Sequence, residues 1–212
     1  MRGVVARAQT RSSPGVPPRG SGSSRPPERQ ASVRLLADRA HYEQLIAEAL
    51  PTARVSVWIS TANLKELRVP APLGSRARAR GEGMSLLEQL ESLGDRGVEL
   101  RVLHGRDPST PFAQQIARRP RLKRRLKLRQ CPRVHFKVVV VDGRLLYLGS
   151  ANLTGAGLGA RSTARRNFEL GILTSDEYLL DTVQAYYEAV WTGLHCSGCT
   201  ARRWCPKPLD GG

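Results

Sequence analysis

The 212-residue chain has no long apolar run, few aromatic residues and few cysteines. No stretch approaches the roughly 18 consecutive apolar residues that a membrane-spanning helix needs, so we do not expect an integral membrane protein. The N-terminus lacks the continuous apolar region of a secretory signal. Aromatic residues make up only 5% of the chain, which argues against a platform on which single-stranded bases would stack. Four cysteines are too few for a disulfide scaffold.

Acidic residues are also scarce compared with basic ones. The chain contains 34 Lys and Arg against 18 Asp and Glu, which gives a formal net charge of +16. Polyanions are therefore the expected partners, nucleic acid first and an anionic phospholipid surface second. The length suits one domain with an appendage and is sufficient for a hydrophobic core.

Composition divides the chain into three segments: 1–31, 32–192 and 193–212. The first holds five prolines and six arginines, and Glu28 is its only acid. We expect this basic tail to be disordered, because it has too little apolar surface to offset the entropy of ordering. It loosely fits an organellar transit peptide. The alternatives are a plain basic tail or an over-long gene start. In either of these cases we expect a bacterial-type cytoplasmic protein.

Residues 32–192 alternate between helical and strand patterns, which predicts an α/β layered domain. The apolar strands of the hairpin region are nearly continuous, which predicts burial on both faces of a central sheet. We also expect an exposed loop over 68–83. The expected helices are 32–50 with Ser32 as N-cap, 84–96, 113–119 and 176–191 with Ser175 as cap, and the expected strands are 55–59, 98–103, 134–141, 145–148 and 168–173.

Asp142 and Gly143 stand between two apolar runs and predict a β-hairpin with a two-residue turn. In that register Val141 pairs with Arg144, so the numbers of paired residues sum to 285. His135 would then lie opposite Ser150, and Lys137 opposite Leu148. Because side chains alternate along a strand, His135, Lys137 and Ser150 would share one face of the sheet, and Asn152 would leave the second strand beside them.

The spacing H-x-K-x4-D-x6-G-S-x-N in residues 135–152 resembles the signature of the phospholipase D superfamily. Asn167-Phe168-Glu169 resembles the N-x-E element of the same superfamily. The resemblance covers about 130–175 and extends with less detail back to residue 32. It implies a phospholipase D-like layered α/β sandwich with a mostly buried central sheet, and 32–192 as the catalytic domain with one motif.

The resemblance implies phosphodiester cleavage in two steps. His135 would attack phosphorus to form a phosphohistidine, while a second histidine protonates the leaving oxygen. Lys137 and Asn152 would hold the nonbridging oxygens with support from Ser150, and Glu169 would orient the nucleophilic imidazole. Asp142 belongs to the signature, but its place at the turn favours a structural role. Since Lys and His supply the positive charge, this chemistry requires no metal cofactor.

The chain contains a single motif, whereas the site requires two histidines. The segment Ser60-Thr-Ala-Asn63-Leu64 faintly echoes Ser150-Ala-Asn152-Leu153, but no H-x-K precedes it. His41 fits ordinary helix packing, and His104 ends a strand. A single-motif chain resembles the bacterial endonuclease branch, in which two subunits share one site. We therefore predict a homodimer with His135 of both chains facing across the two-fold axis.

The segment Arg118–Arg129, RRPRLKRRLKLR, carries eight positive charges in twelve residues, and we expect it to lead directly into the catalytic strand. We expect Leu122 and Leu126 to hold a short helix against the body of the domain. A basic surface around the site favours nucleic acid over a single lipid headgroup. A phospholipase D acting on headgroups and a catalytically silent nucleic-acid-binding module remain alternatives. The predicted substrate-binding residues are Arg124, Arg125, Lys127, Arg129, Arg133, Arg165 and Arg166.

The last segment spells C-x2-C-x5-C-P from Cys196 through Cys199 to Cys205. Short loops of this kind let three thiolates reach one metal centre. The fourth ligand would be Cys131, the only other cysteine, or His195, although residues as close in sequence as His195 and Cys196 rarely both reach one ion. The pattern resembles the Fe–S clasp of RecB-type exonucleases, which implies a structural [4Fe–4S] cluster. Zinc is the alternative, and free thiols or disulfides are the third.

Overall fold

The computed structural model describes residues 28–70, 76–80, 83–205 and 207–211. Most of the tail expected to be disordered, 1–31, lies outside the described residues. Residues 28–31 are exposed and have no regular structure. No helix within the described ranges is long and apolar enough to cross a membrane.

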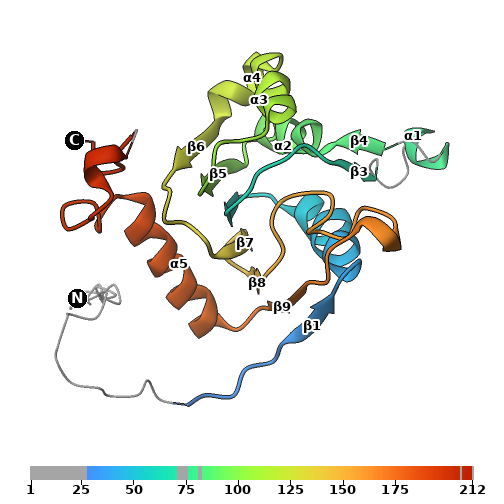
Figure 1. The fold of residues 1–212 in the computed structure, drawn as a ribbon. Coiled ribbons are helices and arrows are strands. Elements are labelled where there is room, and N and C mark those ends of the chain that lie inside the picture. The colour runs from blue at the N-terminus through green and yellow to red at the C-terminus, as the bar shows by residue number, and fades with distance from the viewer. Residues whose placement is uncertain (1–27, 71–75, 81–82, 206, 212) are drawn as a thin grey trace, which may run out of the picture.

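A central sheet of seven strands organises the domain, in the order β1-β9-β8-β7-β2-β5-β6 (Figure 1). Neighbouring strands are antiparallel except for β2, β5 and β6, which run parallel to one another. A separate two-stranded sheet pairs β3 with β4. The strands are β1 (Arg34–Ala37), β2 (Ser56–Thr61), β3 (Arg68–Pro70), β4 (Gly83–Ser85), β5 (Glu99–His104), β6 (Leu126–Gln130), β7 (Lys137–Val141), β8 (Leu145–Gly149) and β9 (Leu170–Thr174).

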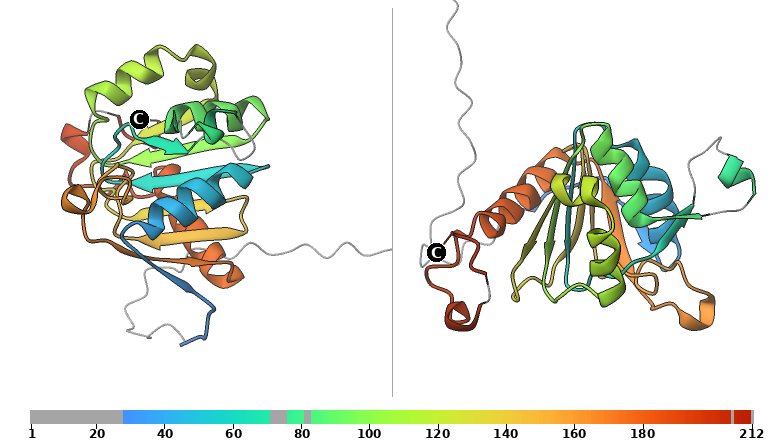
Figure 2. Two further views of the ribbon diagram at one scale, coloured as in Figure 1. Left: turned by 90° about the vertical axis from the view of Figure 1, so that its right-hand side faces the viewer. Right: turned by 90° about the horizontal axis from the view of Figure 1, so that it is seen from above.

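Helices cover both faces of this sheet (Figure 2). The largest apolar core unites one face with η1, α2, α3 and α4, while two smaller cores lie under α5 on the other face. The helices are η1 (His41–Ala49, π type), η2 (Leu50–Thr52), α1 (Arg76–Ala79), α2 (Leu86–Asp95), α3 (Thr110–Ala117), α4 (Pro120–Arg125), η3 (Thr163–Arg165), α5 (Glu177–Trp191) and η4 (Arg202–Trp204). The layered α/β architecture is as predicted.

Strand β7 shows why the hairpin region reads as an apolar run. Val139 and Val141 pack into the large core, and Val138 and Val140 pack beneath α5. Every residue of β7 is buried. The prediction of burial on both faces is confirmed for β7 but not for all of β8, in which Leu148 is exposed.

The helix predicted over 32–50 was wrong in its first half. Arg34–Ala37 forms edge strand β1, which pairs with β9, and the helix begins only at His41. Leu36 is fully buried while Leu35 and Ala37 are exposed. This alternation has period two, as in a strand, and Asp38 at φ 46° turns the chain before the helix.

Three smaller predictions also failed. The 68–83 segment, expected to be a loop, contributes β3, α1 and the first residue of β4, with 71–75 and 81–82 outside the described residues. The cap of α5 is Asp176, whose carboxylate accepts a hydrogen bond from the Leu179 backbone N–H, and not Ser175. The prediction that Leu122 and Leu126 anchor one helix is half right, because α4 ends at Arg125 and Leu126 begins β6.

The hairpin turn forms as predicted, but its register is shifted by one residue. Asp142 and Gly143 adopt φ 55° and 62°, and the Arg144 N–H donates to the Val141 carbonyl over 3.0 Å. The strands, however, pair Val141 with Leu145 and Lys137 with Gly149. Arg144 is therefore one extra residue outside the ladder, and His135 does not lie opposite Ser150. His135 precedes β7 in irregular chain.

The two ends of the sheet differ in content. Strands β1, β2, β5, β6 and β8 finish at one end, where β7 and β9 begin, and we call this the site end. The hairpin turn lies at the opposite, turn end. Lys137, Thr61 and His104 stand in one row across β7, β2 and β5 at the site end. Ligands commonly bind where strands end in this way.

Candidate active site

His135 and Lys137 form the centre of the site. The Lys137 ammonium nitrogen Nζ lies 3.3 Å from both ring nitrogens of His135, and it donates to the His135 carbonyl over 2.7 Å. Lys137 is 6% exposed, whereas the His135 ring is exposed. The chain therefore presents an accessible imidazole beside a fixed cation.

Burial also affects the charge state of this cation. Desolvation lowers the pKa of Lys137 below the ordinary lysine value, and the nearby Glu169 carboxylate offsets only part of the effect. A buried ammonium loses water that it would otherwise bind, so a phosphate oxygen that replaces this water interacts strongly with it.

Asn152 is oriented by backbone donors. Its side-chain oxygen Oδ1 accepts from the Ala62 N–H over 3.1 Å and from the Asn63 N–H over 3.0 Å. Because an amide carries its oxygen and its NH₂ group on opposite sides, these bonds determine which way the group faces. The NH₂ group is turned away from the 62–63 backbone and is available as a donor to an anion.

The sequence echo noted above is a structural neighbour of the motif. Leu64 and Leu153 form a parallel bridge, and the Lys65 N–H donates to the Leu153 carbonyl over 3.1 Å. Thr61 fastens the two segments, since its hydroxyl accepts from the Leu153 N–H over 3.0 Å. Sequence reasoning missed Thr61 as part of the site, although its place in the echo was a usable signal.

Glu169 is buried, and both of its carboxylate oxygens accept hydrogen bonds. The Ser150 hydroxyl donates to one carboxylate oxygen, and the Asn167 NH₂ group donates to the other over 3.0 Å. The Leu170 N–H donates to the Ser150 hydroxyl over 3.1 Å, which fixes that side chain at the start of β9. No hydrogen bond joins Glu169 to His135 among the described residues, and the orienting role of Glu169 stays a prediction.

Asp142 stands apart from this group. It follows β7 at the turn end, about 16 Å along the strand from Lys137. Its carboxylate accepts from the backbone N–H groups of Arg54, Val55 and Ser56 over 2.7–3.1 Å. Burial by itself would raise the pKa of Asp142, but these donors outweigh it and hold the pKa below the ordinary value. The signature aspartate thus joins the hairpin turn to the start of β2.

The other histidines differ in their surroundings. His41 is fully buried, with Nδ1 2.8 Å from the Asp38 carbonyl and its ring edge-on to Tyr147. His104 is 4% exposed and its Nδ1 lies 2.9 Å from the Arg106 carbonyl. Burial lowers the pKa of His104. Its Cα is separated from that of Lys137 by two strand spacings, about 10 Å.

The predicted substrate-binding cations do not form one surface. Arg124 and Arg125 belong to α4, which precedes β6 at the turn end, and Lys127 pairs with Glu99 over 2.7 Å. Arg129 lies over the Trp191 ring and donates to the Trp191 and Leu209 carbonyls. The 118–129 run does not lead directly into the catalytic strand, because α4 lies at the turn end and β6 runs from there to the site end before the 131–136 turn reaches β7.

The other three predicted cations lie at the site end. Arg133 is exposed in the turn before His135, and exposed Arg165 and half-buried Arg166 lie in the loop from β8 to β9. Arg166 is 4.0 Å from Asp38. Sequence reasoning did not include Lys65 and Arg106, which are exposed and follow β2 and β5. Their position just beyond strands that end at the site was the available signal.

The four cysteines line one small cavity between the 130–133 turn and the C-terminal segment. All four thiols are free, and each is half-buried. Burial raises the pKa of Cys131, and the other three thiols act in the same direction. In the conformation described, however, no three His, Cys, Asp or Glu side chains are already placed to hold a metal ion together.

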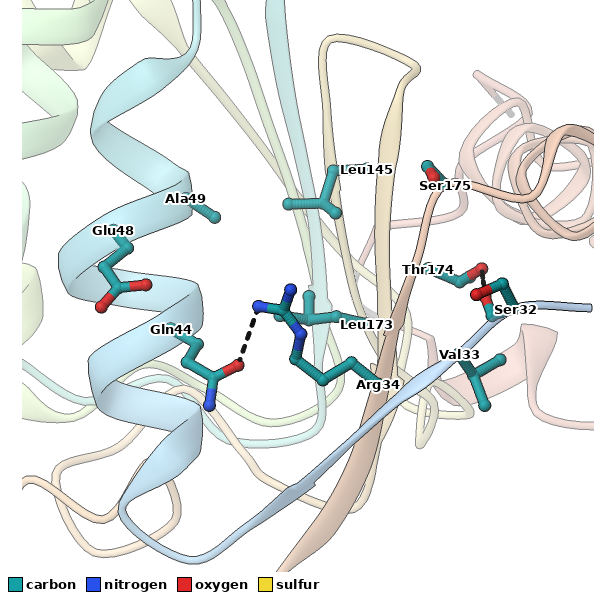
Figure 3. A pocket seen from close by; sticks show the side chains of 10 residues that line it. All are labelled: Ser32, Val33, Arg34, Gln44, Glu48, Ala49, Leu145, Leu173, Thr174 and Ser175. Carbon is teal, nitrogen blue, oxygen red and sulfur yellow. Dashed lines mark hydrogen bonds between the residues drawn. The ribbon is translucent and has the colours of Figure 1, made fainter.

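A larger hollow of about 640 Å³ lies away from the chemistry. Figure 3 shows its lining, in which Arg34 of β1 reaches across to Gln44 of η1, with Leu145 and Leu173 behind. These residues belong to the turn end of the sheet, and no residue of the motif lines this hollow.

Comparisons with known proteins agree with this geometry. The family model for cardiolipin synthase, PLD-like domain, matches residues 46–191. Nuc from Salmonella typhimurium, a phospholipase D family member, has a similar fold, with a TM-score of 0.53 and 20% identity over 77% of this chain and 95% of that one. NucT from Helicobacter pylori has a TM-score of 0.50 and 17% identity over 75% and 94%. The curated protein sequences contain no match. The chain therefore belongs to the family of the cardiolipin synthase, PLD-like domain, within the phospholipase D superfamily, and is an enzyme of the phosphodiesterase class.

Proposed function

We propose that this protein is a metal-independent nuclease that forms a covalent phosphohistidine on His135. The observation that carries the proposal is the buried Lys137 ammonium 3.3 Å from both nitrogens of an exposed imidazole. A ring nitrogen of His135 would attack phosphorus and break the bond to the leaving oxygen, which takes a proton from a second histidine. Water would then attack phosphorus and release His135.

Lys137 and Asn152 would stabilise the charge that develops on the nonbridging oxygens. Lys137 is held by its contact with the His135 carbonyl, and the Asn152 amide is oriented by two backbone donors. Donors that are fixed before the reaction need no reorganisation in the transition state, which makes them effective. We assign Ser150 and Glu169 a positioning role, since they bind each other beside Lys137.

We further propose that a second copy of the chain supplies the second histidine. His41 is enclosed in the core, and His104 is nearly buried with one ring nitrogen on a carbonyl. Two apolar side chains flank Glu169 in sequence: Phe168 is 94% exposed and Leu170, whose N–H binds Ser150, is 60% exposed. An apolar surface this exposed next to an incomplete site is suited to a two-fold contact that brings two His135 rings together.

The distribution of charge supports nucleic acid as the substrate. Lys65, Arg106, Arg133 and Arg165 follow or precede different strands, and the span from β5 to β9 is about 19 Å. A lipid headgroup presents one phosphodiester, whereas a nucleic acid presents a phosphate at every nucleotide and can contact cations along this span. Hydrolysis of phospholipid headgroups remains the second candidate, because the chemistry at His135 would be the same.

Cleavage assays in EDTA test the proposal. Plasmid DNA, RNA, phosphatidylcholine vesicles and bis-p-nitrophenyl phosphate are each incubated with the protein at low salt. We expect nucleic acid and the reporter to be cleaved, and His135→Ala to lower the rate at least about 10³-fold. His195→Gln is the matched control, since it removes an exposed histidine outside the motif. Vesicle hydrolysis with intact DNA and RNA would reverse the choice of substrate.

Quenching in an alkaline denaturant distinguishes the covalent mechanism from simple acid–base catalysis. A labelled diester mixed with excess protein should leave label on the protein, stable to alkali and lost in acid as expected of a phosphoramidate. Absence of that adduct, together with full activity of His135→Ala, would show that the proposed nucleophile is wrong.

A further inference from the structure

The C-terminal segment is held against the chain that leads to His135. Cys131 follows β6, its N–H donates to the His104 carbonyl over 2.9 Å, and its carbonyl accepts from the Val134 N–H over 2.9 Å. Cys131 and Cys196 pack against the same small apolar core, which contains Val134 and Trp191. The last cysteines are thus neighbours of the turn that ends at the proposed nucleophile.

A succession of tight turns keeps three thiols on a short length of chain. The Cys196 N–H donates to the Gly193 carbonyl over 2.8 Å, and the Cys199 N–H donates to the Cys196 carbonyl over 3.1 Å. The Cys205 N–H donates to the Arg202 carbonyl over 3.2 Å. These backbone turns do not by themselves require four unlinked cysteines to lie near one another. The proximity of the thiols therefore indicates that they share a ligand.

All four cysteines line one cavity of about 20 Å³. That is roughly the space one water molecule occupies, and hence enough for one metal ion. A [4Fe–4S] cube is much larger than one ion and would need the two segments to move further, so we take zinc as the occupant and make the cluster an outcome of the test. Zinc in structural sites takes four tetrahedral ligands, and four thiolates are one of its usual sets.

Nearby cations can balance the charge of such a site. Zinc with four thiolates carries a net charge of −2. Arg133 donates to the Cys199 sulfur over 3.6 Å, and Arg202 lines the cavity. Cationic donors next to thiolate sulfurs lessen the repulsion among the sulfurs.

We propose that Cys131, Cys196, Cys199 and Cys205 bind one structural zinc ion, which ties the C-terminal segment to the turn preceding His135. The four thiols surround the cavity but are not yet converged on one point. Ligation therefore requires the four thiols to move toward one point, and binding of the ion would drive this movement. The role is structural, because four protein ligands leave no open position for a substrate.

Metal analysis of the full-length protein purified without added metal or chelator tests the site. We expect one zinc ion per chain, released when a mercurial reagent titrates the thiols and detected with a zinc-binding dye. Cys131→Ser and Cys196→Ser should lose the ion and melt at a lower temperature. His195→Gln should keep it, and so should His135→Ala, whose zinc content is independent of catalysis.

Replacing zinc with cobalt in the wild-type protein tests the site even if the cysteine variants do not fold. The wild-type protein loaded with Co²⁺ should show intense thiolate-to-metal charge-transfer bands and the visible bands of tetrahedral cobalt. Substoichiometric zinc with freely reactive thiols would overturn the proposal. So would iron with inorganic sulfide in a brown protein, or loss of zinc in His195→Gln but not in Cys131→Ser.

Discussion

At the scale of single residues, the motif divides into side chains that touch the proposed phosphate site and one that does not. His135, Lys137 and Asn152 lie at the site end, where Lys137 contacts the His135 ring and Asn152 is fixed by backbone N–H groups. Asp142 is at the other end of β7, bonded to three consecutive N–H groups. The motif thus combines chemistry with the anchoring of the strand that carries it.

Replacing Asp142 separates these two roles. Asp142→Asn keeps an acceptor oxygen but loses the charge, so we expect the free energy of unfolding at pH 7 to fall by about 1–3 kcal/mol. Turnover per folded molecule should remain unchanged, because the site lies about 16 Å away. Urea unfolding and the reporter assay at low temperature measure the two effects. A wild-type stability but a large loss of turnover would show instead that Asp142 takes part in catalysis.

The same carboxylate predicts a pH dependence of stability. Its folded-state pKa is lower than its unfolded value, so its contribution is complete above the unfolded pKa and is lost as pH falls through the folded pKa. Below the ordinary aspartate range, wild type and Asp142→Asn should therefore converge in stability. A constant difference between them down to the lowest pH would contradict this linkage.

Lys137 predicts a pH dependence of activity. Its pKa is lower than that of an ordinary lysine, and only the ammonium form can bind a phosphate oxygen, so kcat/KM should fall on the alkaline side well before an exposed lysine would lose its proton. In Lys137→Arg the cation persists, so the alkaline decline should move to higher pH even if the maximum rate drops. An identical alkaline limb in both proteins would assign it to another group.

At the scale of elements, the positions of loops relative to strand ends decide which cations can contact substrate. Strand β6 separates α4 from the site end by five residues, about 16 Å. The loop from β8 to β9, by contrast, begins and ends at the site end, because β8 finishes there and the antiparallel strand β9 starts there. Several cations of the 118–129 run are also paired with acids, among them Arg119 with Glu88 and Arg121 with Asp95.

A pair of double variants tests this placement. Arg161→Ala with Arg165→Ala removes two exposed charges at the site end, and Lys123→Ala with Arg124→Ala removes two exposed charges on α4. The net charge changes equally in both. We expect only the first pair to weaken DNA binding, with the slope of log K against log salt reduced by roughly 0.9 for each lost phosphate contact. Equal loss in both would indicate non-specific attraction.

At the scale of the whole molecule, the proposed site leaves the apolar side chains of Phe168 and Leu170 exposed on either side of Glu169. Leu170 is 60% exposed although its N–H binds Ser150 of the site. Leu170→Glu should shift the protein from dimer to monomer in analytical ultracentrifugation and lower activity in parallel. Val55→Glu is a matched control, because Val55 is 67% exposed at the turn end. A wild-type monomer with full activity would rule out a shared site and direct attention to His104.

Features of the fold and the site that arise from residues close together in the sequence could be predicted, and those that depend on contacts between distant segments could not. The spacing of the motif and the apolar valines of β7 are local patterns, and they correctly indicated the superfamily, the buried strand and the turn at Asp142-Gly143. The one-residue shift of register could not be predicted, because Arg144 is left outside a ladder whose pairing is set jointly by β7 with β2 and β8 with β9.

The motif in the sequence by itself indicated the superfamily, and through that resemblance the chemistry proposed for His135, Lys137 and Asn152, because the motif consists of residue types a few positions apart. Only the tertiary structure decided which cations stand near them, that Leu35 belongs to an edge strand, and that four cysteines from two distant segments line one cavity. These placements depend on the path of the chain through the sheet. A strand of five residues puts the residues before and after it at opposite ends of the sheet, and strand pairing brings together residues that are far apart in the sequence.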